Sequence, residues 1–115
     1  MAKSDTIRIK HMLDAANEAV VMAKGKSVND ISIDRMLNLS LVKLIEIIGE
    51  AASRVSLDGQ TKHAEIPWGK IIGMRHCLVH GYSDVDFEVL YQTIYEDIPP
   101  LIAALEKIVP PDTEK

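Results

Sequence analysis

Apolar residues recur at three- and four-residue steps along most of the chain, and no segment shows the two-residue alternation of a β-strand. The first helical stripe runs to about Lys24, after Asp5 or Thr6 as a candidate N-cap. Its apolar members are Ile9, Leu13, Ala16, Val20 and Ala23. This pattern predicts an amphipathic helix with one buried face.

The second stripe is the longest and covers residues 33–56, after a candidate cap at Asp30 or Ser32. It consists of Leu37, Leu41, Leu44, Ile45, Ile48, Ala52 and Val55, with Met36, Ile47 and Ala51 beside it. On the polar side, Glu50 and Arg54 have the spacing of a helical ion pair. So wide an apolar arc predicts burial against more than one neighbour, and we expect the second neighbour to be another subunit.

The rest of the chain predicts one loop and two more helices. Residues 57–66 are polar and without period, which predicts the loop, and Pro67 suits the first turn of a helix towards Gly81. A fourth helix begins near Asp84 or Asp86.

Two prolines interrupt the fourth helix, because Pro99 and Pro100 lack the backbone donors that a helix needs and must kink or restart it. Residues 110–115 are expected to fray. Together the segments predict an all-α bundle of four to five helices in a single domain, residues 1–115.

Composition narrows the function classes. The 115 residues carry 13 Lys and Arg against 17 Asp and Glu, a net charge of −4, which disfavours a general nucleic-acid-binding surface but allows a local basic pocket. The single cysteine, Cys77, excludes an internal disulfide and a four-cysteine zinc site, and we expect it to pack as a small apolar residue. No apolar run reaches the length of a membrane span, so a cytoplasmic protein without membrane contact is expected.

The third helix carries an anomaly, because Arg75 falls in the middle of its apolar side. A guanidinium keeps its charge there and must either find an anion or open onto a cleft. The pattern leaves two interpretations open: a structural ion pair, for instance with an acid of the fourth helix, or a functional cation.

A second stripe of the same helix holds Gly69, Gly73, His76 and His80. The glycines would allow another backbone or a ligand to come close, next to two imidazoles. His76 and His80 have a spacing that could also hold a metal ion, but no third ligand accompanies them. Gly81 would loosen the helix end and free Tyr82 to approach His80.

Residues 66–86 read IPWGKIIGMRHCLVHGYSDVD, and this run resembles the signature of the HepT-like branch of the HEPN superfamily. That signature is an arginine, four residues, a histidine, one residue and a tyrosine, which Arg75, His80 and Tyr82 match. Residues 47–52 and 96–101 resemble the family too, so the likeness covers nearly the whole chain.

The resemblance implies a dimeric, metal-independent endoribonuclease that needs no cofactor and acts as the toxin of a toxin–antitoxin pair. Arg75 and His80, with His76 beside them, would then be catalytic and would face the same residues of the partner subunit. It also implies a minimal nucleotidyltransferase as the antitoxin, which transfers AMP onto Tyr82 and silences the toxin.

The chain departs from the family pattern at three places. His76 stands where asparagine is usual, Gly69 where a basic residue is frequent, and Tyr91 where tryptophan is common. The residue types still suit RNA cleavage, since imidazole can serve as acid or base and arginine can stabilise phosphorane charge. Two alternatives remain: a non-catalytic module that binds a nucleotidyltransferase or a nucleotide, and a small HxxxH metalloprotein.

Overall fold

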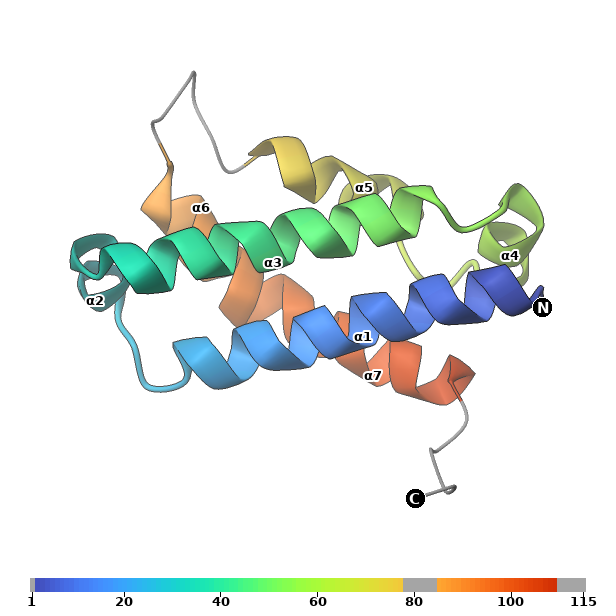
Figure 1. Ribbon diagram of the computed structural model, residues 1–115, viewed down its shortest axis with the longest axis horizontal. Coiled ribbons are helices and arrows are strands. Elements are labelled where there is room, and N and C mark those ends of the chain that lie inside the picture. The colour runs from blue at the N-terminus through green and yellow to red at the C-terminus, as the bar shows by residue number, and fades with distance from the viewer. Residues whose placement is uncertain (1, 78–84, 110–115) are drawn as a thin grey trace.

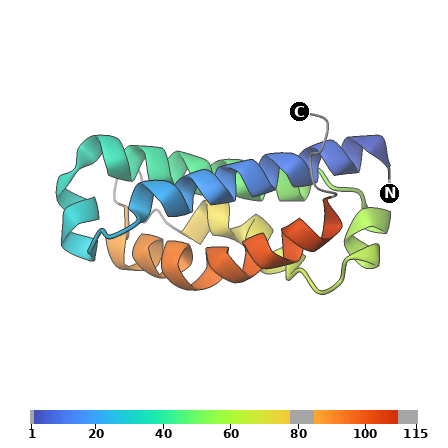
Figure 2. The same ribbon diagram turned by 90° about the horizontal axis from the view of Figure 1, so that it is seen from below.

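Two long antiparallel helices, α1 (Lys3–Ala23) and α3 (Arg35–Ser53), form one layer of the molecule. The structure is a computed structural model that describes residues 2–77 and 85–109 (Figure 1). Helices α5 (Trp68–Cys77) and α7 (Ile98–Ile108) form the layer behind them, as the view from below shows (Figure 2). Within the described residues, helices are the only regular elements, which confirms the all-α prediction.

Three short helices join or extend the long ones. They are α2 (Val28–Ile33), α4 (Leu57–Lys62) and α6 (Phe87–Gln92). The chain continues from α6 through a π-helical segment, Thr93–Asp97, into α7, so the last quarter of the described chain follows one helical path.

The prediction that residues 57–66 form a loop is wrong at its start, where α4 lies. The Ser56 hydroxyl caps α4 by accepting the N–H of Gly59 at 3.0 Å. Asp5 in turn accepts the hydroxyl of Ser56 at 2.6 Å and its N–H at 2.9 Å. A carboxylate far away in the sequence therefore holds this polar segment in place, which periodicity could not reveal.

The predicted caps of the first two long helices are also wrong. Helix α1 begins at Lys3, and Asp5 is buried against Ser56 instead of capping its own helix. The predicted second helix is broken at Asp34, whose side chain accepts the N–H of Leu37 at 3.1 Å and so starts α3. Ser27 caps the preceding α2, and Asp30, in the first turn of that helix, accepts the backbone N–H of Ser27 in return.

The predicted start of the fourth helix at Asp86 is confirmed, since its side chain accepts the N–H of Val89 at 3.1 Å. The other candidate, Asp84, lies outside the described residues, as does the tail 110–115. The interruption expected at the prolines is a π-helical segment within a continuous helical path. Ile98 donates to the carbonyl of Thr93, one residue further back than in an α-helix, and α7 then has both prolines in its first turn.

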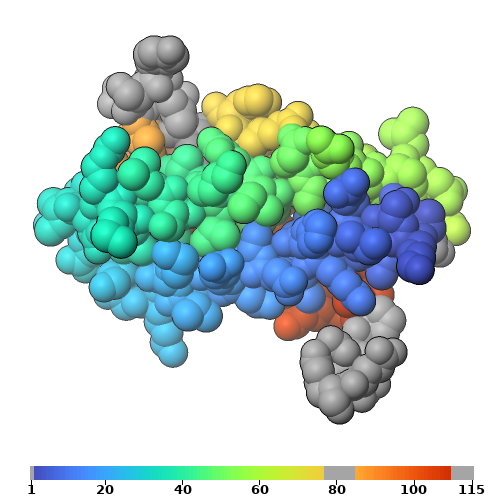
Figure 3. Space-filling model, in the orientation of Figure 1, coloured from blue at the N-terminus to red at the C-terminus, as the bar shows by residue number. Residues whose placement is uncertain are grey.

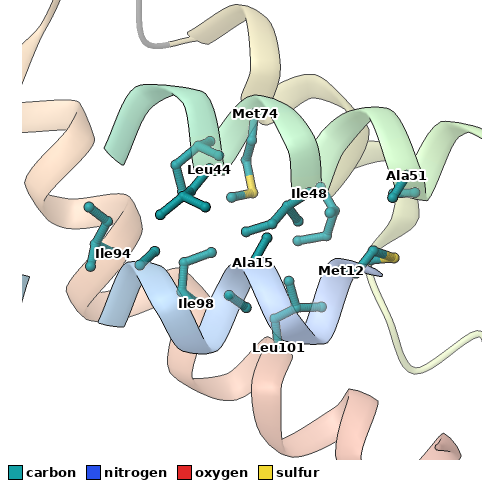
Figure 4. Packing of buried hydrophobic residues seen from close by; sticks show 14 of the residues in the cluster. Met12, Ala15, Leu44, Ile48, Ala51, Met74, Ile94, Ile98 and Leu101 are labelled. Atoms are coloured by element: carbon teal, nitrogen blue, oxygen red, sulfur yellow. The ribbon is translucent and has the colours of Figure 1, made fainter. Parts of the chain in front are cut away.

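The core lies between the two layers (Figure 4). Side chains of α1, α3, α5, the π-helical segment and α7 meet there, among them Met12, Ile48, Met74, Ile94 and Leu101. The predicted stripe of the second helix is buried throughout, from Leu37 to Val55. None of the described helices has the length and apolarity that a membrane crossing requires.

The three apolar residues beside the main stripe of the second helix differ in their exposure to solvent. Ala51 is buried, whereas Met36 is 83% and Ile47 37% exposed. Leu39, on the same helix, is 49% exposed. A second subunit on this face of α3 therefore stays a prediction.

Candidate functional site

The position of Arg75 depends on a close contact between α3 and α5. A Cβ at Gly49 of α3 would lie 3.1 Å from the Cβ of Arg75 and 3.3 Å from the carbonyl oxygens of Ile71 and Ile72. Any side chain at Gly49 would push α5 away from α3, so glycine allows the two backbones to approach. A glycine inside a strongly helical pattern is the sequence signal for such an approach.

Gly69 and Gly73, the two glycines on the second stripe of the third predicted helix, have open space around them among the described residues. A methyl group at Gly69 or Gly73 would meet no described atom within 4 Å. Within the described part of the chain, therefore, no other backbone packs closely against these two glycines.

Arg75 is half-buried and its Nη1 donates to Oε1 of Glu50 at 2.6 Å and to Oγ of Ser53 at 3.4 Å. Its Nε is buried and has no hydrogen-bond partner among the described residues. The structural ion pair, one of the two open interpretations, is therefore present, and the acid found among the described residues belongs to α3 instead of the fourth helix.

Glu50 pairs with a second arginine as well. Its Oε2 accepts Nε of Arg54 at 3.0 Å, one helical turn further along α3, which confirms the predicted i,i+4 pair. Because the Glu50 side chain is 52% exposed, the two pairs add little to stability. Their main effect is to fix the direction in which the Arg75 guanidinium points.

Arg75 opens onto a cleft of about 510 Å³ between α1, α3 and α5. Figure 3 shows α1 and α3 side by side, with α5 beyond α3. The lining residues are Arg8, His11, Lys43, Glu46, Ile47, Glu50, Ala51, Arg54, Arg75 and His76. Both sequence expectations for a cation on the apolar side are thus met, because Arg75 has an anion and also faces a cleft.

Of the four predicted site residues, Arg75 and His76 lie in this cleft. His80 and Tyr82 lie outside the described residues, and so does the side chain of Cys77. The structure also adds an imidazole, because His11 of α1 lines the same cleft. The His11 side chain is exposed.

Sequence reasoning missed the acid that orients Arg75 and the cations contributed by the other helices. Glu50 was recognised only as the partner of Arg54, and neither Arg8 nor Lys43 was assigned to a site. Which polar faces share a cleft depends on the pairing of α1 with α3, and periodicity within one helix does not contain that information.

Among the described residues, no three His, Cys, Asp or Glu side chains gather closely enough to hold a metal ion. The described part of the cleft offers the fixed guanidinium of Arg75 together with two imidazoles, two further guanidinium groups and one ammonium group. Such a set suits the binding of phosphate oxygens.

Residues 12–108 match the Ribonuclease HepT-like family. A protein of Caldanaerobacter subterraneus subsp. tengcongensis, named "Putative RNase", is 33% identical over 101 residues, which cover 88% of this chain and 90% of that protein. The "Probable ribonuclease HepT" of Thermococcus cleftensis is 39% identical over 79 residues, covering 69% of this chain and 72% of the relative. No solved structure matches the chain significantly. The match over most of its length shows that the chain belongs to the Ribonuclease HepT-like family.

Proposed function

We propose that this protein is an endoribonuclease of the HEPN type that cleaves RNA without a metal ion. The observation that carries the proposal is the Arg75 guanidinium, held by Glu50 at 2.6 Å and opening onto a cleft lined with further cations. Membership of the family and the RNase names of its relatives support the same activity.

The proposed reaction is a transesterification. A base takes the proton of the ribose 2′-OH, the 2′-oxygen attacks the phosphorus, and the bond to the 5′-oxygen breaks as an acid supplies its proton. His80 and His76 are the proposed proton-transfer residues, since imidazole titrates near neutral pH. Arg75 stabilises the additional negative charge on the phosphorane oxygens.

A symmetric homodimer would bring a second set of these residues to the site. The exposed Met36 and Leu39 on α3 support such an assembly. Sedimentation of the purified protein as a monomer at micromolar concentration would contradict it.

The toxin–antitoxin role belongs to the same proposal. A minimal nucleotidyltransferase is the proposed antitoxin, and Tyr82 the acceptor of its AMP group. A phosphodiester next to Arg75 would occupy the cation that the RNA phosphate needs. The modification would thus block the site without unfolding the protein.

The test is RNA cleavage by the purified chain in the presence of EDTA. We expect cleavage by the wild type, products with a cyclic 2′,3′-phosphate and a 5′-hydroxyl, and a loss of about 10²–10⁴-fold in rate for His80→Ala. Activity that disappears with EDTA and returns with zinc or magnesium would favour the metalloprotein instead. Tight nucleotidyltransferase binding without any cleavage would favour the non-catalytic module.

A further inference from the structure

Two cations of the cleft have no role in the reaction described above. Arg8 of α1 is half-buried and Lys43 of α3 is exposed, and both line the cleft. Within residues 2–77 and 85–109 neither forms an ion pair, whereas Arg54 and Arg75 both pair with Glu50. Arg8 and Lys43 therefore present charges that no described carboxylate neutralises.

The cleft differs in charge from the molecule as a whole. Four arginine or lysine side chains and two glutamates line it, which leaves a net charge of +2 with neutral histidines. The whole chain has a net charge of −4. An anionic ligand is therefore attracted to this cleft and repelled by most of the remaining surface.

The spacing of the cations indicates a ligand with several phosphates. Lys43 precedes Glu50, the partner of Arg75, by seven residues on α3, a rise of about 10 Å along the helix. Lys43 thus lies about two helical turns from the place where Glu50 holds Arg75, and a ligand with more than one phosphate can reach both cations. Ile47 lies between the two positions, is 37% exposed and offers an apolar surface for a base or a ribose.

The size of the cleft favours a single strand. Its volume of about 510 Å³ is typical of a site for a small ligand, so we expect it to hold a short stretch of a single strand. From these observations we infer that Arg8 and Lys43 bind the phosphates of single-stranded RNA that flank the phosphate cleaved at Arg75. This inference rests on the proposed function, because it extends the same cleft.

The test compares two double variants of the full-length chain. Arg8→Ala/Lys43→Ala removes the two cations from the cleft, and Lys10→Ala/Arg35→Ala removes one lysine and one arginine from the exposed surface of the same two helices. Both are made in a His80→Ala background so that the RNA stays intact. Binding of a short fluorescein-labelled single-stranded RNA is followed by anisotropy at several salt concentrations.

The inference predicts that the cleft variant binds this RNA about 2- to 30-fold more weakly than the control variant. The slope of log Kd against log salt should fall by about 0.7 for each lost phosphate contact, hence by about 1.4. Equal affinities and slopes for the two variants, with RNA still cleaved by the wild type, would overturn the inference and leave the proposed function standing.

Two other outcomes would also overturn it. A wild type that neither binds nor cleaves RNA would contradict the proposed function and the inference together. If the cleft variant binds RNA like the control but loses its dimer on sedimentation, the two cations serve a protein interface.

A folding defect of the cleft variant would appear in circular dichroism. In that case Arg8→Lys/Lys43→Arg, which keeps both charges, should restore the fold and the affinity for RNA.

Discussion

Glu50 accepts a hydrogen bond from Nη1 of Arg75 across 2.6 Å, and its other oxygen accepts one from Arg54 at 3.0 Å. One carboxylate of α3 thus orients a guanidinium that α5 contributes. Since the pair is partly exposed, its stability contribution is below about 1 kcal/mol. Loss of the Arg75–Glu50 pair should therefore change the rate of catalysis and leave the stability of the fold nearly unchanged.

Glu50→Gln should lower kcat by about 10- to 100-fold, because Arg75 loses the charge that holds it in position. KM should stay unchanged or fall, since the cleft also loses a negative charge that repels RNA. Initial-rate measurements separate the two constants, and the melting temperature should remain close to that of the wild type.

Glu46→Gln is the matched control for this prediction. Glu46 lines the same cleft on the same helix, but it forms no ion pair with any described residue. Its kcat should stay within a few-fold of the wild type. If Glu46→Gln and Glu50→Gln show the same kcat and KM, Glu50 does not position Arg75 and affects the reaction only through the negative charge that it adds to the cleft.

Gly49→Ala should lower the melting temperature. The added methyl group would lie 3.1 Å from the Cβ of Arg75 and 3.3 Å from the carbonyl oxygen of Ile71, and these atoms belong to a packed helix that cannot easily move. Overpacking of this kind costs about 1–3 kcal/mol, more than the gain of about 1 kcal/mol from replacing glycine by alanine in a helix.

Gly69→Ala provides the comparison, because its methyl group meets no described atom within 4 Å. Its thermal unfolding should occur at the wild-type temperature or above. Were Gly49→Ala equally stable, the close approach of α3 and α5 would not depend on glycine.

The helical class and the core could be predicted from the sequence because both follow from periodicity within a segment. The seven-residue stripe from Leu37 to Val55 is buried as its spacing indicates. Features that depend on distant partners could not be predicted in this way. The contact of Asp5 with Ser56 spans 51 positions of the chain, and that of Arg75 with Glu50 spans 25.

Asp5 should make stability depend on pH. The hydrogen bonds from the Ser56 hydroxyl and from its backbone N–H lower the pKa of Asp5 in the folded state. A carboxyl with a lowered folded-state pKa stabilises the fold above its unfolded pKa of about 4, and this contribution is lost as the pH falls through the folded-state value.

Urea unfolding of wild type and Asp5→Asn at pH 7 and near pH 3 checks this prediction. The wild type should be the more stable protein at pH 7, and the difference should shrink in acid. Asp14→Asn, on the exposed side of the same helix, is the control. A difference that is the same at both pH values would mean that the charge of Asp5 does not contribute.

Tyr82→Phe should remain an active toxin that the nucleotidyltransferase no longer silences, because the acceptor oxygen is absent. Intact-mass spectrometry after co-expression should show the added mass of an adenylate on the wild type and not on the variant. An unmodified wild type that is nevertheless inhibited would show that the antitoxin acts by binding alone.

The most direct measurement is the single-turnover rate of RNA cleavage by Arg75→Ala and Arg54→Ala with saturating protein. Both arginines line the cleft and both pair with Glu50, so the two variants lose the same charge from the same place. If Arg75 stabilises the phosphorane, its alanine variant should lose about 10²-fold or more in rate, whereas Arg54→Ala should stay within a few-fold of the wild type. Equal losses, or an Arg75→Ala variant that still cleaves at the wild-type rate, would contradict this role of Arg75.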